Sequence, residues 1–176
     1  MALAFPFDYH APMQQRLLGI DPGLGITGYA VLDVTNQGPK LCEAGVLRGG
    51  TGPIEDRLLA LHQGLLEVID LYHPKQMAVE QLYAHYKHPR TAIIMGHARG
   101  VILLAASVRG IPTISYSATQ VKKLITGSGR ASKEQIQLTI AQEMGLAAPP
   151  EPPDVADALA VGLCHYYATL RNREDQ

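Results

Sequence analysis

Four acidic residues occupy positions that suggest metal chemistry. Asp154 and Asp157 open the apolar segment PPDVADALAVGLCHYY, and residues three apart on a helix lie on one face. Asp21 ends the apolar segment RLLGI, and Glu80 ends the segment QMAV. An acid at the end of a buried strand needs a partner, because burying an unpaired charge is costly. The positions of these acids therefore raise the question of whether the four carboxylates lie close together in the fold.

Three of the acids also have an ordinary structural explanation, whereas Glu80 at the end of a strand is harder to explain in this way. Asp is a favoured N-cap, a second acid suits the positive end of a helix, and the prolines before Asp154 halt the preceding chain. Asp21 before Pro-Gly fits a turn. Four converging carboxylates instead fit Mg²⁺, with Mn²⁺ as an alternative, because hard cations prefer oxygen ligands and keep neighbouring acids ionised. Two such ions in one active site can support phosphodiester cleavage.

The segments that carry these acids follow a β-β-β-α-β-α-β-α order. Hydrophobic periodicity and turn residues predict strands over 16–21, 27–34, 41–49, 76–81 and 111–117, and helices over 54–72, 89–110, 118–127, 132–145 and 154–172. This order predicts an α/β fold, with one mixed five-stranded sheet and helices on both faces. The first and fourth strands are expected to be neighbours, which brings Asp21 and Glu80 to one opening.

The predicted domain spans residues 16–172. Residues 1–15 are expected to form a flexible N-terminal extension, and residues 173–176 a C-terminal tail. By sequence, no apolar run is expected to be long enough to cross a bilayer, and two cysteines, Cys42 and Cys164, fit buried thiols in a reducing compartment. We therefore expect a cytoplasmic protein without a membrane partner.

Charge is segregated along the chain although the net charge is only −1. No Asp or Glu occurs from Gln81 to Lys133, a stretch that holds Lys87, Arg90, Arg99, Arg109, Lys122, Lys123, Arg130 and Lys133. Such a segment predicts an electrostatic track for a polyanion. Surface cations that merely solvate helices explain one or two of these residues, but not the absence of acids over the whole stretch.

Within that stretch, the charge pattern alone marks some residues as candidate contacts for the polyanion: Lys87, Arg90, Lys123 and Arg130. Two glycines in TGSGR, Gly127 and Gly129, are expected to bring backbone N–H groups close to a phosphate.

Five segments together resemble the successive motifs of the RuvC family of Holliday-junction resolvases. They are LGIDPGLGITGYAVL, AVEQLY, ARGVILLAA, ATQVKKLITGSGRASK and DVADALAVGLCHYY, in the family's order over about residues 17–168. The resemblance implies a ribonuclease H-like fold and a homodimer with two active sites. It also implies Mg²⁺-dependent paired nicks in opposite strands of a four-way DNA junction, in recombination and repair, with RuvA–RuvB as partner.

By the same resemblance, Asp21, Glu80, Asp154 and Asp157 match the family's four catalytic and metal-binding acids. Some relatives carry histidine where this chain has Asp154.

Three further positions match DNA-contacting residues of the family. Tyr83 matches an aromatic position that usually holds phenylalanine, and its ring can stack on a base unpaired at the crossover. A tyrosine packed in a strand-to-loop corner is the structural alternative. Lys122 and Lys133 match basic positions that contact DNA phosphates.

The apolar segment TAIIMGHARGVILLAA is more hydrophobic than a one-sided surface helix needs to be. It fits either a deeply buried helix or a dimer contact, and a two-fold enzyme suits a substrate with two symmetric cut sites.

Three rival functions share part of this pattern. GIDPGLGITGYA resembles the first phosphate loop of actin-like ATPases, but the chain lacks their second glycine-rich loop and second lobe. A branched-DNA-binding protein that does not cut would gain nothing from four acids near phosphates. An RNA-processing resolvase-like nuclease shares the first motif, whereas QVKKLITGSGRASK and DVADAL favour the junction resolvase.

Overall fold

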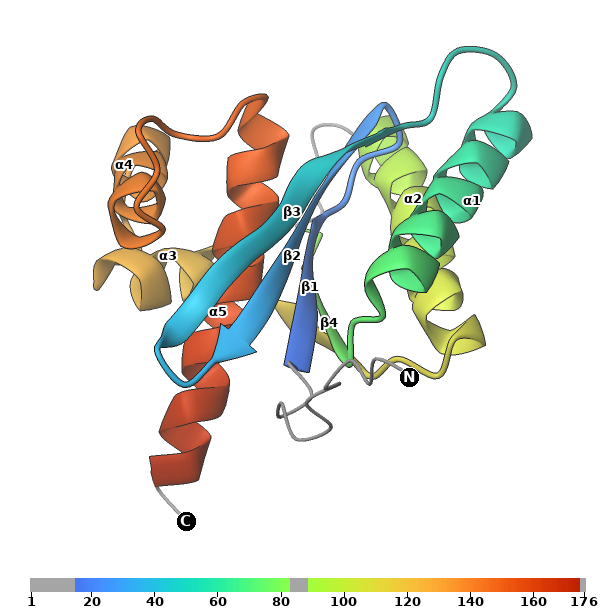
Figure 1. Cartoon of the computed structure of the whole chain (residues 1–176). Coiled ribbons are helices and arrows are strands. Elements are labelled where there is room, and N and C mark those ends of the chain that lie inside the picture. Colours follow the sequence, from blue (N-terminus) through green and yellow to red (C-terminus); the bar gives the residue numbers. More distant parts are fainter. Residues whose placement is uncertain (1–14, 83–88, 175–176) are drawn as a thin grey trace, which may run out of the picture.

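A five-stranded mixed sheet forms the centre of the molecule (Figure 1). The computed structural model describes residues 15–82 and 89–174, and from residue 171 onward only the backbone. The strands lie in the order β3-β2-β1-β4-β5 and are β1 (Gln15–Asp21), β2 (Ile26–Thr35), β3 (Gly38–Arg48), β4 (Gln76–Glu80) and β5 (Thr113–Tyr116). The first three strands pair antiparallel, whereas β4 pairs parallel with both β1 and β5. The predicted fold class and the neighbouring first and fourth strands are confirmed.

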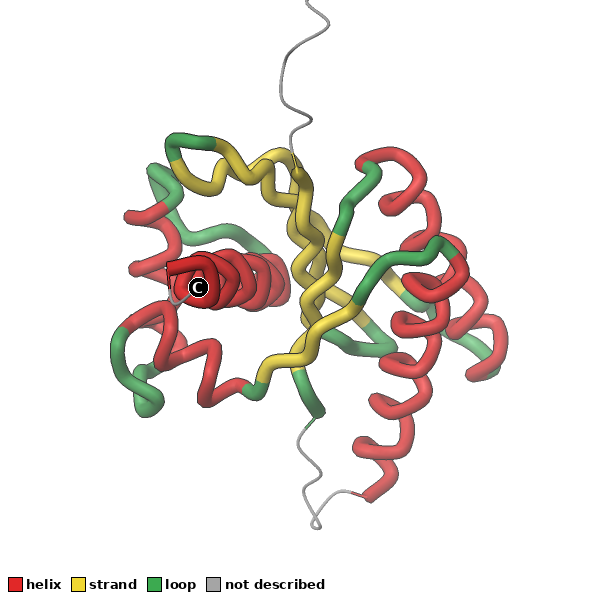
Figure 2. The backbone as a smooth tube through the Cα atoms, turned by 90° about the horizontal axis from the view of Figure 1, so that it is seen from below, coloured by secondary structure: helices red, strands yellow, loops and turns green. Residues whose placement is uncertain are grey.

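Helices cover both faces of the sheet, as Figure 2 shows in a view from below. On one face lie α1 (Ile54–Tyr72) and α2 (Pro89–Val108), which pack against each other. On the other face α5 (Pro153–Glu174) lies against β1 and β2, with α3 (Ala118–Thr126) and α4 (Lys133–Glu143) beside it. Helix α5 and strand β1 reach just past the predicted domain limits of 172 and 16.

Alternating side chains of β1 build two separate cores. Leu18 and Ile20 belong to the core under α1 and α2, together with Leu65 and Ile102. Leu17 belongs to the core under α5, with residues such as Leu159 and Leu163. By the same alternation Gly19 and Asp21 face α5, and so do Ala78 and Glu80 on β4. The pleat therefore presents both strand-borne acids to the helix that carries the other two.

Capping fixes the helices near the acids. Ser132 and Gln135 form the predicted capping box of α4, and Ser117 and Gln120 form a second one at the start of α3. The predicted N-cap role of Asp154 is wrong, because α5 begins at Pro153 and Asp154 lies within its first turn. Proline suits the first helical position since its missing N–H would have had no helical partner there.

Helix α2 corrects the expectation that no segment is long enough for a membrane. It is the one helix of the described residues that could span a bilayer by length and composition, with 22% of its apolar window buried. Ala98, Ile102, Ala105 and Ala106 pack on the core, while Ile93, Leu104 and Val108 are exposed. Of the two free thiols, Cys164 is buried as expected, and Cys42 is only half-buried.

A buried polar network joins β4, β5 and α5. His165 on α5 is 2% exposed, and its Nε2 lies 3.0 Å from the Gln76 Oε1. Its Nδ1 lies 2.8 Å from the Tyr116 hydroxyl. Because the amide oxygen only accepts, Nε2–H donates to Gln76 and Nδ1 accepts from Tyr116. The network holds a neutral imidazole, and burial lowers the pKa of His165.

This burial predicts an acid-sensitive contribution to stability. Around the ordinary histidine pKa of 6.5 the unfolded chain takes up a proton at His165 more readily than the folded chain does, so stability falls as pH drops through this range. Replacing His165 with glutamine is expected to flatten this slope by up to about 1.4 kcal/mol per pH unit. Urea unfolding at several pH values measures it, with H97Q, on the exposed surface of α2, as the control. Parallel slopes for wild type and H165Q would contradict the assignment.

Candidate active site

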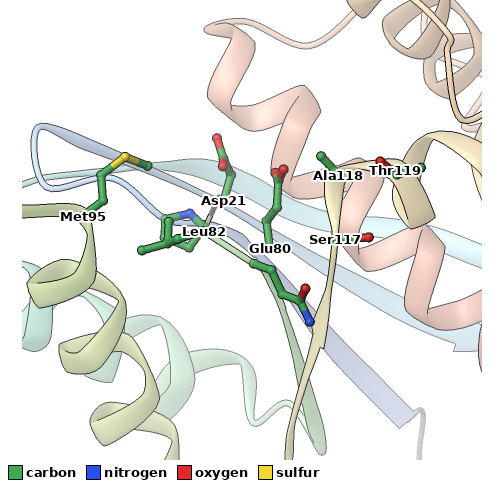
Figure 3. Close-up of a pocket in the computed structure, with 9 residues that line it drawn as sticks. Asp21, Glu80, Leu82, Met95, Ser117, Ala118 and Thr119 are labelled. Atoms are coloured by element: carbon green, nitrogen blue, oxygen red, sulfur yellow. The ribbon is translucent and has the colours of Figure 1, made fainter. Parts of the chain in front are cut away.

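The ends of two parallel strands bring two acids together. Ile20 on β1 pairs with Val79 on β4, so Asp21 and Glu80 are the next residues on adjacent strands. Both side chains face α5 by the alternation described above. Figure 3 shows the two carboxyl groups beside each other and pointing the same way.

Three glycines let α5 approach the sheet closely enough to bring in the other two acids. Gly28 pairs with Asp21, and a Cβ at Gly28 would collide with the backbone carbonyl of Asp154. A Cβ at Gly19 would collide with the Ala158 carbonyl and lie 2.6 Å from the backbone nitrogen of Gly162. We call this contact of Gly19, Gly28 and Gly162 the glycine seam. It places the first turn of α5 directly over the strand pair that holds Asp21.

A cavity of about 400 Å³ opens beside Asp21 and Glu80, within the usual size range of ligand sites. We call it the Asp21 cavity; its other lining residues are Pro22, Gln81, Leu82, Met95, Ser117, Ala118 and Thr119. In Figure 3 Met95 from α2 and Thr119 from α3 stand on opposite sides of the two acids. The cavity therefore joins elements from both faces of the sheet.

A second, smaller cavity lies on the other side of Glu80. We call it the Lys133 cavity, and it is lined by Glu80, Ala118, Val121, Lys122, Lys133, Ile136, Asp157 and Ala160. Lys133 Nζ lies 2.8 Å from Asp157 Oδ2 there. The site thus has an acidic cavity and an adjoining one that holds two lysines.

The acids perturb one another. Burial, then the charges of Glu80, Asp157 and Asp154, raises the pKa of Asp21 to about 7. Burial and the charge of Asp157 also raise the pKa of Glu80, while Lys122 and Lys133 oppose the rise. Negative charge is therefore in excess around Asp21.

The carboxylates fit a divalent cation by their chemistry. All four donors are hard oxygens, and an added positive charge would relieve the repulsion that raises the pKa of Asp21. Within residues 15–82 and 89–174, no three His, Cys, Asp or Glu side chains already stand as a ready metal cage. Asp157 instead forms an ion pair with Lys133.

The predicted DNA contacts are only partly gathered at the site. Lys122 lines the Lys133 cavity, whereas Lys123 and Arg130 are exposed nearby on α3 and the loop that follows it. Arg90 is exposed in the first turn of α2, on the other side of the sheet. Tyr83 and Lys87 lie outside the described residues.

In the part of the acid-free stretch that the structure describes, the cations do not form one continuous basic surface, contrary to the sequence expectation. Helices α2 and α3 cover opposite faces of the sheet (Figure 2). Arg109 forms a two-bond ion pair with Asp70 of α1, at 2.7 Å for each bond. Arg99 is half-buried and donates to the Ser115 hydroxyl at 2.7 Å. Acids elsewhere in the sequence and internal hydrogen bonds thus remove two cations from the track.

Gly127 and Gly129 stabilise the conformation of the loop that contains them. Gly127 ends α3 with a φ of 77°, a left-handed conformation that favours glycine, and its N–H donates to the Lys123 carbonyl at 3.0 Å. This N–H therefore already has an acceptor and is not available to a phosphate, contrary to the prediction. Gly129 packs against Thr119, where a Cβ would lie 3.0 Å from the threonine methyl group.

Sequence reasoning missed the glycine seam and the start of α3 as parts of the site. The seam glycines, Gly19 and Gly28, stood within LLGID and TGYA, where glycine inside a strand signals a close backbone approach. The α3 start carried a second capping signal, Ser117 followed three residues later by Gln120.

Comparison with known proteins identifies the family of this chain. The family model described as crossover junction endodeoxyribonuclease RuvC matches residues 17–165. A protein of that name from Rhodopirellula baltica is 52% identical, over 86% of this chain and 85% of its own. One from Desulforamulus reducens is 45% identical, over 85% of this chain and 91% of its own.

Solved structures show the same relationship. Thermus thermophilus RuvC superposes with a TM-score of 0.81 at 34% identity, over 89% of this chain and 96% of its own. The same protein in complex with a Holliday junction substrate gives a TM-score of 0.82 at 33% identity, with the same coverage. The yeast mitochondrial resolvase Ydc2, at 15% identity and a TM-score of 0.64, shares the fold. The acids at the strand ends thus stand on a ribonuclease H-like scaffold, and the chain belongs to the RuvC family of crossover junction endodeoxyribonucleases.

Proposed function

We propose that this protein resolves four-way (Holliday) DNA junctions by paired metal-dependent nicks in opposite strands, in recombination and repair. Asp21, Glu80, Asp154 and Asp157 are its catalytic residues and metal ligands. The observation that carries the proposal is the placement of Asp21 and Glu80 on adjacent strand ends under the first turn of α5. The Holliday junction complex of the related Thermus protein supports the substrate.

The metal in this proposal is Mg²⁺, with Mn²⁺ as a substitute and two ions per active site during catalysis. When bound, such ions activate a water and stabilise the leaving oxygen of a phosphodiester. The side chains of the protein would hold and orient these ions. Asp21 and Glu80 are fixed by strand pairing, and Asp154 and Asp157 by the backbone contact of α5 with the glycine seam.

DNA phosphates are bound beside the acids by cations of α3, α4 and the loop between them. Lys122 and Lys133 line the Lys133 cavity, and the exposed Lys123 and Arg130 extend this basic edge. Lys and Arg on a phosphate backbone give affinity without sequence selection. Gly129 supports the loop that carries Arg130, Arg90 approaches from the far face, and Lys87 and the stacking Tyr83 complete the DNA contacts.

The functional unit is a homodimer that forms through α2. Ile93, Leu104 and Val108 are 60%, 55% and 55% exposed at helical spacing on this helix. Between them, Gly96 and Gly100 leave open space on the same stripe, because a Cβ at either would meet no atom within 4 Å. Small residues four apart let two helix backbones approach closely. A second copy of α2 therefore fits this surface.

Replacing Leu104 with glutamate is expected to convert the dimer to a monomer, because the charge would lie in the apolar contact. Light scattering after gel filtration measures the mass. The control is L138E on α4, which alters a leucine that is 62% exposed away from α2. Dimeric L104E, or monomeric L138E, would place the interface elsewhere.

The cellular setting of the proposal follows the family. The enzyme acts in the cytoplasm, where its two thiols stay reduced. The RuvA–RuvB branch-migration complex delivers the junction.

The deciding experiment is nicking of a synthetic four-way junction with and without Mg²⁺, with linear duplex of the same sequence as the control. We expect cutting of the junction alone, only with metal, in symmetrically placed pairs. Tight junction binding without cutting under Mg²⁺ or Mn²⁺ would support a non-cleaving branched-DNA-binding protein. Preferential cutting of structured RNA would support an RNA-processing nuclease.

A further inference from the structure

One ion pair joins the acid cluster to a cation that also faces outward. The described residues contain three ion pairs, and only Lys133–Asp157, at 2.8 Å, involves one of the four acids. The Lys133 side chain is 54% exposed and that of Asp157 is 27% exposed. The ammonium group therefore contacts a candidate metal ligand and is at the same time within reach of solvent.

The position of Lys133 in its helix is not explained by helix stability. It is the first residue of α4, directly after the Ser132 N-cap. A cation at a helix N-terminus is unfavourable, because that end of the helix carries partial positive charge. The compensation comes from the acids: the hydrogen bond to Asp157 and the charges of Asp157, Asp21 and Asp154 raise the pKa of Lys133.

The lysine and a metal ion compete for the same negative charge. Asp157 Oδ2 accepts the ammonium hydrogen bond at 2.8 Å, and a divalent ion among the acids would repel the ammonium group. Lys133 lines the same cavity as Lys122, so a DNA phosphate bound beside Lys122 would receive the displaced ammonium group.

We propose that Lys133 is a positioning residue that occupies the cation position of the acid cluster in the metal-free protein and moves to a DNA phosphate when the metal binds. This inference rests on the proposed function and adds a coupling to it. Metal binding frees the lysine for DNA, and DNA binding removes the competitor of the metal. By thermodynamic reciprocity each ligand then tightens the other.

The first test measures Mg²⁺ affinity of the full chain without DNA by titration calorimetry. We expect K133M to bind Mg²⁺ about tenfold more tightly than wild type, since the competing cation is gone. K133R keeps the charge and is expected to stay near the wild-type affinity. K123M removes an exposed lysine from the neighbouring helix and is the matched control. Equal affinities for wild type and K133M would overturn the proposal.

The second test measures junction affinity with and without Ca²⁺ at constant ionic strength, with strand integrity checked on a denaturing gel. Ca²⁺ takes oxygen ligands as Mg²⁺ does. We expect Ca²⁺ to tighten junction binding about tenfold in wild type and K123M, and about twofold or less in K133M. An equal gain in all three proteins would overturn the coupling. If the first test instead shows no saturable Mg²⁺ binding in either wild type or K133M, the proposed metal site itself is overturned.

Discussion

Replacing Asp21 with asparagine is expected to reduce junction cleavage by at least about 10²–10³-fold, the scale on which a preorganised charged group acts on a transition state. Junction binding without divalent metal is expected to persist, because the proposed phosphate contacts come from Lys122, Lys133 and their neighbours. Single-turnover nicking and equilibrium binding of the same labelled junction separate the two effects. Loss of both would contradict a purely catalytic role for Asp21.

The same substitution is expected to stabilise the metal-free protein at alkaline pH. The folded pKa of about 7 lies above the ordinary aspartate value of 3.8, so the folded carboxyl holds its proton more firmly than the unfolded one. Stability is therefore lost as pH rises from about 4 to 7, and at pH 8 the ionised Asp21 costs up to about 4 kcal/mol.

Urea unfolding at pH 8 and pH 4 without metal checks this second effect. The gain of D21N over wild type is expected at pH 8 and should vanish near pH 4, where both folded chains carry a neutral group. A Mg²⁺-saturated wild type should regain part of the difference, because a ligand that binds only the folded state stabilises it. A D21N variant that is less stable than wild type at pH 8 would contradict the unfavourable burial and charge repulsion described for ionised Asp21.

Gly28→Ala is the substitution with the next largest expected effect. Its Cβ would overlap the Asp154 carbonyl, and neither backbone can yield by a change of rotamer. Forced overpacking costs about 1–3 kcal/mol of stability. A displacement of α5 by about 1 Å would also move two carboxylates and reduce cleavage by about 10²-fold.

Gly25→Ala is the matched control, since Gly25 lies three residues before Gly28, in the turn that leads into β2, and its Cβ would meet no atom within 4 Å. It is expected to leave stability within about 1 kcal/mol of wild type and cleavage unchanged. Both variants are assayed for cleavage and for the free energy of unfolding. A fully active, fully stable G28A would show that the helix is not seated on the strand as described.

Much of this architecture was accessible from local sequence signals. The period-2 and period-3.6 patterns predicted the five strands and five helices, and the capping box at Ser132 predicted the start of α4. The acids at the ends of LLGI and MAV pointed to one opening because adjacent parallel strands end at the same edge. The helices and strands depend on residues that are neighbours in sequence, and the common opening depends only on the pairing of the first strand with the fourth.

What sequence reasoning could not supply were contacts between distant segments. The pairing of Arg109 with Asp70 joins the end of α2 to α1, and nothing in the acid-free stretch around Arg109 reveals it. The bond between Lys133 and Asp157 spans 24 positions and depends on how α4 lies against α5. The predicted start of α5, at Asp154, was one residue too late. Asp154 has the residue type of a good N-cap, but the backbone geometry of proline makes Pro153 a good first helical residue.

The division of the interior by the sheet has an evolutionary consequence. The core under α1 and α2, with Leu18, Ile20, Leu65 and Ile102, contains none of the four acids and none of the seam glycines. Stabilising changes usually carry a cost where activity needs a strained site, and here that strain is confined to the α5 side. Adaptation to a hotter or colder habitat can therefore proceed by repacking one half of the interior, while the half that carries the proposed active site stays under separate selection.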